Sequence, residues 1–437
     1  MRKFTILWLA HLIAATGARM ASFAITLWVW ELTGSATALV LTGFFYKLPI
    51  IVASLFAGIV VDRVSRKYLM ILSQVVAVIS ALLVLLLYLS GHLAIWHLYA
   101  AALVKGGFDQ FGGLAYRASI ALLVAPANYV RALSMTRAIG ALVGIAIPAA
   151  AGMLYPVLGL GGILPISLAT VAFSIAFLSV LKIPPPIECD GPKLEAKRKG
   201  WASYVALLWA EVTFGLRYIW RSAGLRSIVG ITTLFWLFQM LGGAICDPMI
   251  LARSGGSATV LGTIGTVWGI GGLGAAVLVS LWGGFHSNVR GMLVGFMGAG
   301  LAEIAFGLGQ DLSVWLPAGF FASITFPLLS GSERALLMSA APVEVQGRIF
   351  AARDLVNDTA EGAAMLLAGI LSDGLLEPAM QSPGPLPALF APIFGTGAGA
   401  GMALLYVGSA IAMLLVGIIG FRMPQLRLIE KTAKVEP

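Results

Sequence analysis

Long apolar stretches follow one another along almost the whole chain, with short charged segments between them. The hydrocarbon core of a bilayer is about 30 Å thick, so a helix that crosses it needs roughly 20 consecutive apolar residues. Of the 437 residues, 59% are hydrophobic and only 11% are charged, whereas about a quarter are charged in a typical soluble domain. A soluble core cannot hide so much apolar surface. The sequence therefore predicts an integral membrane protein.

We predict an all-α membrane protein with twelve transmembrane helices in two parallel halves of six. The first six predicted spans are residues 4–30, 39–61, 68–90, 94–124, 132–156 and 159–182. The second six are residues 226–252, 258–284, 289–309, 313–341, 349–376 and 398–422. These spans define an N-terminal bundle (1–182), a cytoplasmic linker with an amphipathic segment (183–225) and a C-terminal bundle with a short cytoplasmic tail (226–437). A Pro- and Gly-rich stretch, residues 376–397, is predicted to be an external loop.

An internal repeat supports this division into halves. Residues Gly34–Leu39 (GSATAL) recur as residues Gly256–Leu261 (GSATVL), an offset of 222, and each copy opens the second predicted span of its half. Because both copies then have the same orientation in the membrane, they indicate two parallel six-helix repeats. Chance similarity between apolar segments is the alternative explanation.

The net charge of +9 comes from basic residues in the short segments between predicted spans. Segments that follow even-numbered spans contain Arg63, Arg66, Lys67, Arg131, Arg290 and Arg348. On the opposite side we find only Arg253. Since cytoplasmic loops of membrane proteins carry an excess of Lys and Arg, both termini are predicted to be cytoplasmic. The basic residues do not gather on one soluble face, which argues against a nucleic-acid partner.

The segment between the second and third predicted spans reads Gly58-Ile-Val-Val-Asp62-Arg63-Val-Ser-Arg66-Lys67. It resembles the loop motif of the major facilitator superfamily, G-x-x-x-D-R-x-x-R-K. The upstream stretch LWVWELTGSA, residues 27–36, resembles the drug-exporter branch of this superfamily that contains the macrolide efflux proteins. The resemblance implies two six-helix bundles in a plasma membrane, most simply a bacterial inner membrane. It also implies that the bundles rock around a central cavity and export small molecules, driven by inward proton flow.

This loop motif is predicted to form a gate. Gly58 lets two helices approach closely, and the Asp62 carboxylate can face a helix N-terminus or an arginine. By the internal repeat, its partner lies near Arg348 and Arg353, at the start of the eleventh predicted span. We expect Asp62 to bridge the two halves on the cytoplasmic side and to hold the outward-open state. The alternative is that the charges of this motif, Asp62, Arg63, Arg66 and Lys67, only determine topology.

A second motif lies in the fifth predicted span, where small residues and a proline recur at every fourth position: Gly140, Gly144, Pro148 and Gly152. They form one stripe for close helix packing, and Pro148 permits a kink. The stripe resembles the glycine-rich, proline-containing run of antiporters in the same superfamily.

Ionisable side chains at membrane depth are costly, so each is a candidate functional residue. Asp109 lies near the middle of the fourth predicted span, with Lys105 one turn earlier on the same face. A structural pairing of the two and a role in transport are both open. Arg19, beyond the midpoint of the first span, either balances an acidic group or contacts an anionic substrate.

The eleventh predicted span carries a ladder of carboxyl groups. Asp354, Asp358 and Glu361 stand at i, i+4 and i+7, on one helical face from the cytoplasmic end to the middle of the span. Such a ladder can pass protons, or Asp354 only caps the helix start. We expect Glu361 to bind and release a proton, because its depth desolvates the carboxylate.

No cofactor or metal site is predicted. The two cysteines, Cys189 and Cys246, and the four dispersed histidines have neither disulfide nor metal-ligand spacing. The chain has no nucleotide-binding loop of the G-x-x-x-x-G-K-[ST] type, so an ion or substrate gradient must supply the energy.

Together these patterns predict a secondary active exporter of small hydrophobic or amphiphilic molecules, of the drug and macrolide efflux type, rather than an enzyme. Its partners would be the transported molecule, protons and the lipid bilayer, and we expect a monomer. Within the superfamily, the alternative is a dedicated exporter of an endogenous metabolite, such as a siderophore, or a lysolipid mover. A membrane-bound enzyme or receptor is the alternative from another class.

Overall fold

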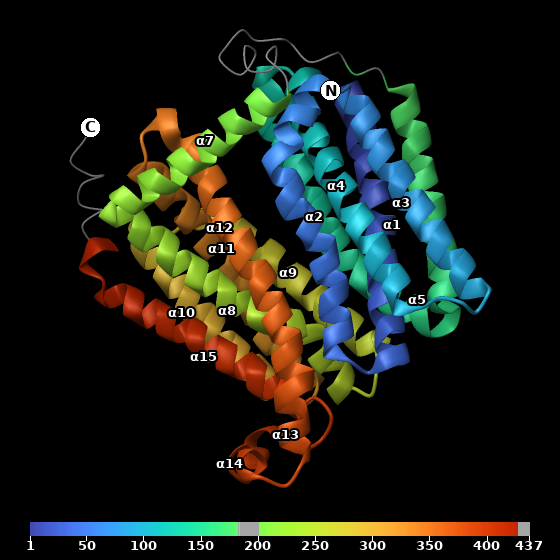
Figure 1. Cartoon of the computed structure of the whole chain (residues 1–437), viewed down its shortest axis with the longest axis vertical. Helices are drawn as coiled ribbons and strands as arrows, with labels where there is room; N and C mark the ends of the chain where they lie inside the picture. Colours follow the sequence, from blue (N-terminus) through green and yellow to red (C-terminus); the bar gives the residue numbers. More distant parts are fainter. Residues whose placement is uncertain (182, 184–200, 427–437) are drawn as a thin grey trace. The chain divides into compact units, whose positions relative to one another are not determined.

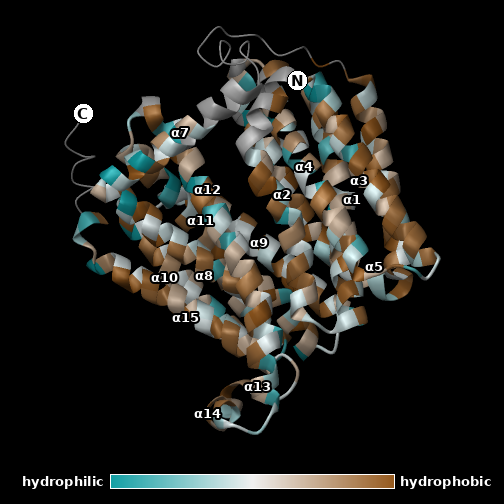
Figure 2. Ribbon diagram, in the orientation of Figure 1, coloured by the Kyte–Doolittle hydropathy of each residue, from teal (hydrophilic) through white to brown (hydrophobic). Residues whose placement is uncertain are grey.

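The computed structural model describes residues 1–181, 183 and 201–426. Most of the predicted linker before residue 201, and the tail after residue 426, lie outside the described residues. Within them the regular elements are helices and no strand occurs. Figure 2 shows hydrophobic residues over most of the length of these helices. The chain forms two compact units, residues 1–189 with 255–266 and residues 190–254 with 267–437.

The first unit is built around the N-terminal helices (Figure 1). These are α1 (Arg2–Thr33), α2 (Ala36–Arg63), α3 (Arg66–Leu89), α4 (Ile95–Leu123) and α5 (Tyr129–Val180). Ser35 is the N-cap of α2, since its side chain accepts a hydrogen bond from the Ala38 amide at 3.2 Å. Helix α4 packs against both α2 and α3, and α1 packs against α5. Apolar side chains from all five helices form one buried core in this unit.

Helix α5 contains a reversal of the chain. It is 52 residues long, and Gly159 interrupts it with a φ of 59° and a ψ of −169°. Glycine adopts a positive φ at little cost because it has no Cβ. The interruption falls at the boundary that the sequence predicts between the fifth and sixth spans.

The second unit holds the remaining helices (Figure 1). These are α7 (Trp201–Arg221), α8 (Ala223–Arg253), most of α9 (Ala258–Trp282), α10 (Asn288–Leu308), α11 (Leu312–Ala340), α12 (Val343–Leu371), α13 (Glu377–Gln381), α14 (Pro385–Phe394) and α15 (Ala400–Arg422). Helix α10 packs against α11 and α15, and α8 packs against α12 and α15. The first residues of α9, which the sequence assigns to the second half, cluster with the first unit.

Ten of the described helical stretches are long and apolar enough to cross a membrane. The stretch Arg131–Val180 is 50 residues long and is interrupted at Gly159, so it can supply two crossings. Helix α4 is not among the ten, because Lys105, Asp109 and other polar residues lower its hydropathy. When the two segments of α5 are counted separately and α4 is added, the number of candidate crossings rises from ten to twelve. The multi-pass helical fold is confirmed, and the twelve crossings stay a prediction.

Residues 376–397 are predicted to be a loop without helices, and this prediction is wrong, because the stretch contains two short helices. A π-helical turn, Ser372–Leu376, joins α12 to α13, and α14 follows at Pro385–Phe394. Pro385 stands in the first turn of α14, where a missing backbone N–H costs nothing. Proline and glycine thus mark the ends of short helices here, and both helices are too short to cross a bilayer.

The Glu377 carboxylate caps the beginning of α15 from a distant position in the chain. It accepts hydrogen bonds from the backbone amides of Gly399 (2.6 Å), Gly401 (2.9 Å) and Met402 (3.2 Å). The first amides of a helix have no partner inside the helix, so this carboxylate supplies one. It thereby attaches α13 to α15.

We expect Glu377→Ala to lower the free energy of unfolding by about 2 to 3 kcal/mol, because hydrogen bonds to a charged group are lost together. Titrating the purified protein from mild detergent into a denaturing one measures this change. Gln381→Ala is the matched control, since it removes only the exposed bond from the Gln381 amide to Glu377 (2.9 Å). Equal effects of the two substitutions would contradict the capping role.

Candidate functional site

A cavity of about 230 Å³ lies within the first unit, among α1, α3, α4 and α5. Alanine and glycine residues make up much of its wall, and larger apolar side chains complete it. The polar groups that line it are His11, Ser73, Gln74, Lys105, Asp109 and Tyr116. Pockets for drug-sized ligands usually have a volume of about 300 to 1,000 Å³. This cavity is therefore somewhat smaller than a typical pocket of that kind.

Lys105 and Asp109 form an ion pair at the edge of this cavity, one turn apart on α4. The Tyr46 hydroxyl of α2 donates a hydrogen bond to the same carboxylate at 2.9 Å. The Lys105 ammonium also lies 5.0 Å from the centroid of the Tyr46 ring, within range of a cation–π contact. The three side chains thus form a compact, formally neutral cluster, which lowers the cost of placing charges at membrane depth.

A glycine makes this cluster possible. Gly106 of α4 lies directly against the backbone of α2, and a Cβ added to it would overlap the Tyr46 carbonyl oxygen. The close approach of the two helices brings the Tyr46 side chain within reach of Asp109. Gly107, next in sequence, has room for a Cβ at 3.6 Å from the Pro49 side chain.

Two further groups give the cavity wall its polarity. His11 of α1 stacks on Tyr116 of α4, with ring centroids 4.0 Å apart and an interplanar angle of 21°. The side-chain oxygen of Gln74 is buried and has no hydrogen-bond partner among the described residues. Since a buried acceptor without a partner is unfavourable, this oxygen can accept a hydrogen bond from a bound molecule.

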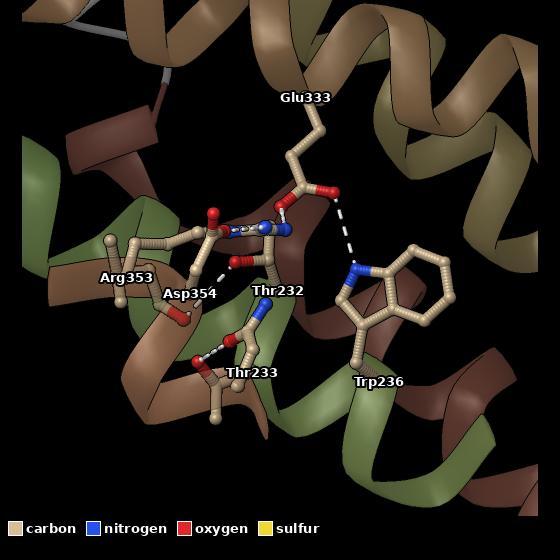
Figure 3. A network of polar contacts seen from close by, with 8 residues as sticks. Thr232, Thr233, Trp236, Glu333, Arg353 and Asp354 are labelled. Carbon is tan, nitrogen blue, oxygen red and sulfur yellow. Dashed lines mark hydrogen bonds and ion pairs between the residues drawn. The ribbon is translucent and has the colours of Figure 1, made fainter. Parts of the chain in front are cut away.

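A second polar cluster lies in the other unit, buried among α8, α11 and α12 (Figure 3). Arg353 of α12 pairs with Glu333 of α11 and with its own neighbour Asp354 (2.8 Å). The Trp236 indole of α8 donates to the other Glu333 oxygen at 3.2 Å. When the Asn357 amide donates to Thr233 (2.5 Å), its oxygen accepts from Arg353 Nη2 (3.0 Å) and Nε (3.2 Å). The guanidinium is therefore held on three sides.

The structure places the predicted gating residues in different surroundings. Arg66 donates to the Ala118 carbonyl at 2.9 Å and Lys67 to the Ser179 carbonyl at 2.6 Å, both inside the first unit. The Arg348 guanidinium lies 5.0 Å from the Phe214 ring centroid. For Gly58, Asp62 and Arg63 the structure describes only the backbone. A bridge from Asp62 to Arg348 or Arg353 therefore stays a prediction.

The small-residue stripe of α5 has two distinct parts within the first unit. A Cβ on Gly152 would lie 2.8 Å from the Ala258 carbonyl oxygen and 3.0 Å from the Gly262 Cα. Pro148 borders the same contact, since its carbonyl oxygen faces Gly262. Gly140 and Gly144 have open space where their Cβ atoms would stand. Only one end of the stripe is thus closely packed.

The remaining predicted charges do not gather at one site. Arg19 is exposed on α1. Asp354 is bound to Arg353, so the first member of the carboxyl ladder belongs to an ion-pair network. Asp358 and Glu361 are half-buried on α12, in the second unit, whereas Asp109 belongs to the first.

Glu303 of α10 lies within the predicted span 289–309, so it is a candidate as an ionisable residue at membrane depth, although no specific role was predicted for it. It is only 5% exposed. Cys246 of α8 and Tyr406 of α15 lie within electrostatic range of it and hydrogen-bond each other. Burying a carboxylate without a paired charge costs several kcal/mol, so such a residue is a candidate for binding a proton. In the sequence, the feature that points to this residue is that Glu303 is the single acidic residue among the 21 residues of α10.

The long apolar helices define the class of protein, a multi-pass helical membrane protein, and the internal cavity gives a small molecule a place to bind. The chain belongs to the Major Facilitator Superfamily, whose sequence profile matches residues 7–352. The resemblance inferred from the loop motif is thereby confirmed.

Known proteins similar to the chain include bacterial efflux proteins. Macrolide efflux protein A of Streptococcus pyogenes is 20% identical over 373 residues, which cover 85% of this chain and 89% of the relative. Multidrug efflux pump Tap of Mycolicibacterium fortuitum is 22% identical over 430 residues, which cover 97% and 96%. Crystal structures of the nucleoside transporter NupG and of a D-xylose-proton symporter share the fold, with TM-scores of 0.67 and 0.68. Their sequences are 14% and 12% identical to this chain, respectively. Each match covers 97% of this chain, and the matches cover 100% of the NupG chain and 98% of the symporter chain.

Proposed function

We propose that the chain is a secondary active exporter of small hydrophobic or amphiphilic molecules, coupled to inward proton flow by alternating access. The observation that carries the proposal is the cavity of the first unit, where apolar walls surround an ion pair and an unpartnered amide oxygen. Such walls suit hydrophobic substrates, and a few polar groups orient them. Similarity to two efflux proteins over most of the chain supports the outward direction. The proposal includes a monomer in the bacterial inner membrane with both termini in the cytoplasm.

Asp109 is the group that we propose to bind the coupling proton. Its ion pair with Lys105 requires an ionised carboxylate. Protonation would end this pair and leave Lys105 as an uncompensated cation beside the cavity. A cation there disfavours a cationic or hydrophobic substrate, so proton and substrate would oppose each other, as exchange in opposite directions requires. Asp358, Glu361 and Arg19 remain further candidates for coupling.

Transport by the purified protein in liposomes tests the proposal, with a fluorescent cationic dye and a macrolide as substrates and an imposed pH gradient. We expect Asp109→Asn to reduce gradient-driven accumulation roughly tenfold, corresponding to about 1.4 kcal/mol. Because the variant fixes this side chain in a neutral form, downhill exchange of dye without a gradient should weaken and should no longer depend on pH.

Asp311→Asn is the matched control. Asp311 is exposed before α11, where its carboxylate accepts from the Ser313 amide at 2.9 Å, and asparagine caps a helix about as well as aspartate. Glu361→Gln tests the other carboxylate. Full accumulation by Asp109→Asn would refute its coupling role. If folded wild-type protein moves neither compound under any gradient, drug export is wrong and a dedicated metabolite exporter becomes the better hypothesis.

A further inference from the structure

Helix α7 has two chemically different faces. Gly215 and Ile219 are buried on one side. The opposite side exposes two indoles, Trp209 (62% exposed) and Trp220 (68% exposed), together with the guanidinium groups of Arg217 and Arg221. In a helix of 3.6 residues per turn these four positions lie on one side, which we call the outer face of α7.

The side of α7 that carries Gly215 and Ile219, its inner face, packs α7 against the second unit. A Cβ on Gly215 would overlap the Arg348 carbonyl oxygen and lie 2.8 Å from the Ala352 Cβ, so α7 lies directly on α12. Ile219 belongs to the buried core of this unit. In Figure 1, α7 lies crosswise to α8 and α12. Since the inner face is occupied by protein, the outer face is the one available to another partner.

The chain itself places α7 at the membrane boundary. Ser222 separates α7 from α8, and its side chain accepts a hydrogen bond from the Leu225 amide at the start of α8. Helix α8 is one of the helices long and apolar enough to span the bilayer. Only Ser222 therefore lies between Arg221 and the beginning of a membrane-spanning helix, where lipid headgroups lie.

The outer face carries the two residue types that suit this depth. Tryptophan is enriched where membrane meets water, because its ring is apolar and its N–H is polar. Among the described residues, the guanidinium groups of Arg217 and Arg221 form no hydrogen bond or ion pair. Arginine binds phosphate oxygens through two parallel N–H donors. Both are thus available to a negatively charged partner.

We propose that the outer face of α7 binds the headgroups of anionic phospholipids, with Arg217 and Arg221 on the phosphates and Trp209 and Trp220 inserted at the level of the headgroups. The bilayer that surrounds α8 supplies this partner. The site requires only that the protein spans a membrane, and it is independent of the transported substrate.

Electron paramagnetic resonance of spin-labelled lipids tests this with the full-length protein in phosphatidylcholine vesicles. The spectrum separates lipids bound to the protein from lipids in the bulk bilayer. We expect wild type to prefer labelled phosphatidylglycerol over labelled phosphatidylcholine. At the α7 sites this preference should fall about 30-fold in Arg217→Gln/Arg221→Gln, or about 1 kcal/mol per arginine. Arg217→Lys/Arg221→Lys keeps the charge and should retain most of the preference.

Arg131→Gln/Arg334→Gln is the control, because it removes two exposed arginines from other helices and changes the net charge equally. An equal loss of preference in this control would mean that the whole protein's charge acts, and the proposal would be overturned. It would also be overturned if the α7 variant changed the oligomeric state and left lipid preference unaltered, since the face would then be a protein interface.

Discussion

Replacing Glu333 with alanine is expected to lower the free energy of unfolding by about 3 to 5 kcal/mol, the usual cost of breaking a buried ion pair by removing one partner. Glu333 is 2% exposed and accepts from both Arg353 and Trp236. Without it the Arg353 guanidinium stays buried between α8, α11 and α12 with less charge to balance it. Its remaining acidic partner, Asp354, has a side chain that is 60% exposed and so lies in a more polar environment.

Unfolding in detergent, followed by circular dichroism, measures this loss. Asp354→Ala removes the exposed partner of the same arginine, and we expect it to cost under about 1 kcal/mol, as surface ion pairs do. Glu333→Leu/Arg353→Met should recover most of the stability, because an apolar pair of similar size avoids a buried charge altogether. If Glu333→Ala were no more harmful than Asp354→Ala, the network would not contribute as we describe.

Gly106→Val is expected to have the second large effect, a loss of about 3 kcal/mol of unfolding free energy, which is the upper part of the range for overpacked cores. A side chain at this position meets the Tyr46 backbone of α2, which cannot rotate away as a flexible side chain can. The two helices must therefore separate. Separation also removes the Tyr46 hydroxyl from Asp109, so folded protein should lose gradient-driven transport as well.

Gly107→Ala and Gly113→Ala are matched controls on the same helix. The first places its Cβ at an ordinary distance of 3.6 Å from Pro49, and the second meets nothing within 4 Å. Both should keep wild-type stability, and Gly107→Ala, whose residue does not line the cavity, should also keep wild-type transport. Wild-type behaviour of Gly106→Val would show that α2 and α4 do not need their close contact.

Local patterns explain why much of the fold was predictable. A membrane-spanning helix is defined by the hydropathy of its own residues, so the predicted spans agree with α1 to α4 and α8 to α12 within a few residues. The break near Gly159 and the amphipathic helix α7 followed from local composition in the same way. The helices α13 and α14 were missed, because frequent Pro and Gly residues obscure helices that are this short.

Contacts between distant residues were predictable only where they lie on one helix. Lys105 and Asp109 are one turn apart on α4, so their pairing could be anticipated. The Tyr46 hydroxyl on Asp109 and the Arg353 pair with Glu333 join different helices, and hydropathy contains no information about either. The burial of Glu303 likewise depends on how α8 and α15 pack around α10.

The sequence by itself determined that this chain is a helical membrane protein, because burial in lipid acts on each stretch of about 20 residues separately. The loop motif of residues 58–67 indicated the superfamily. Only the tertiary structure decided which charges meet, which glycines allow helices to touch and where a cavity remains. Those properties arise from packing between helices, and packing depends on the shape of side chains that are far apart in the chain.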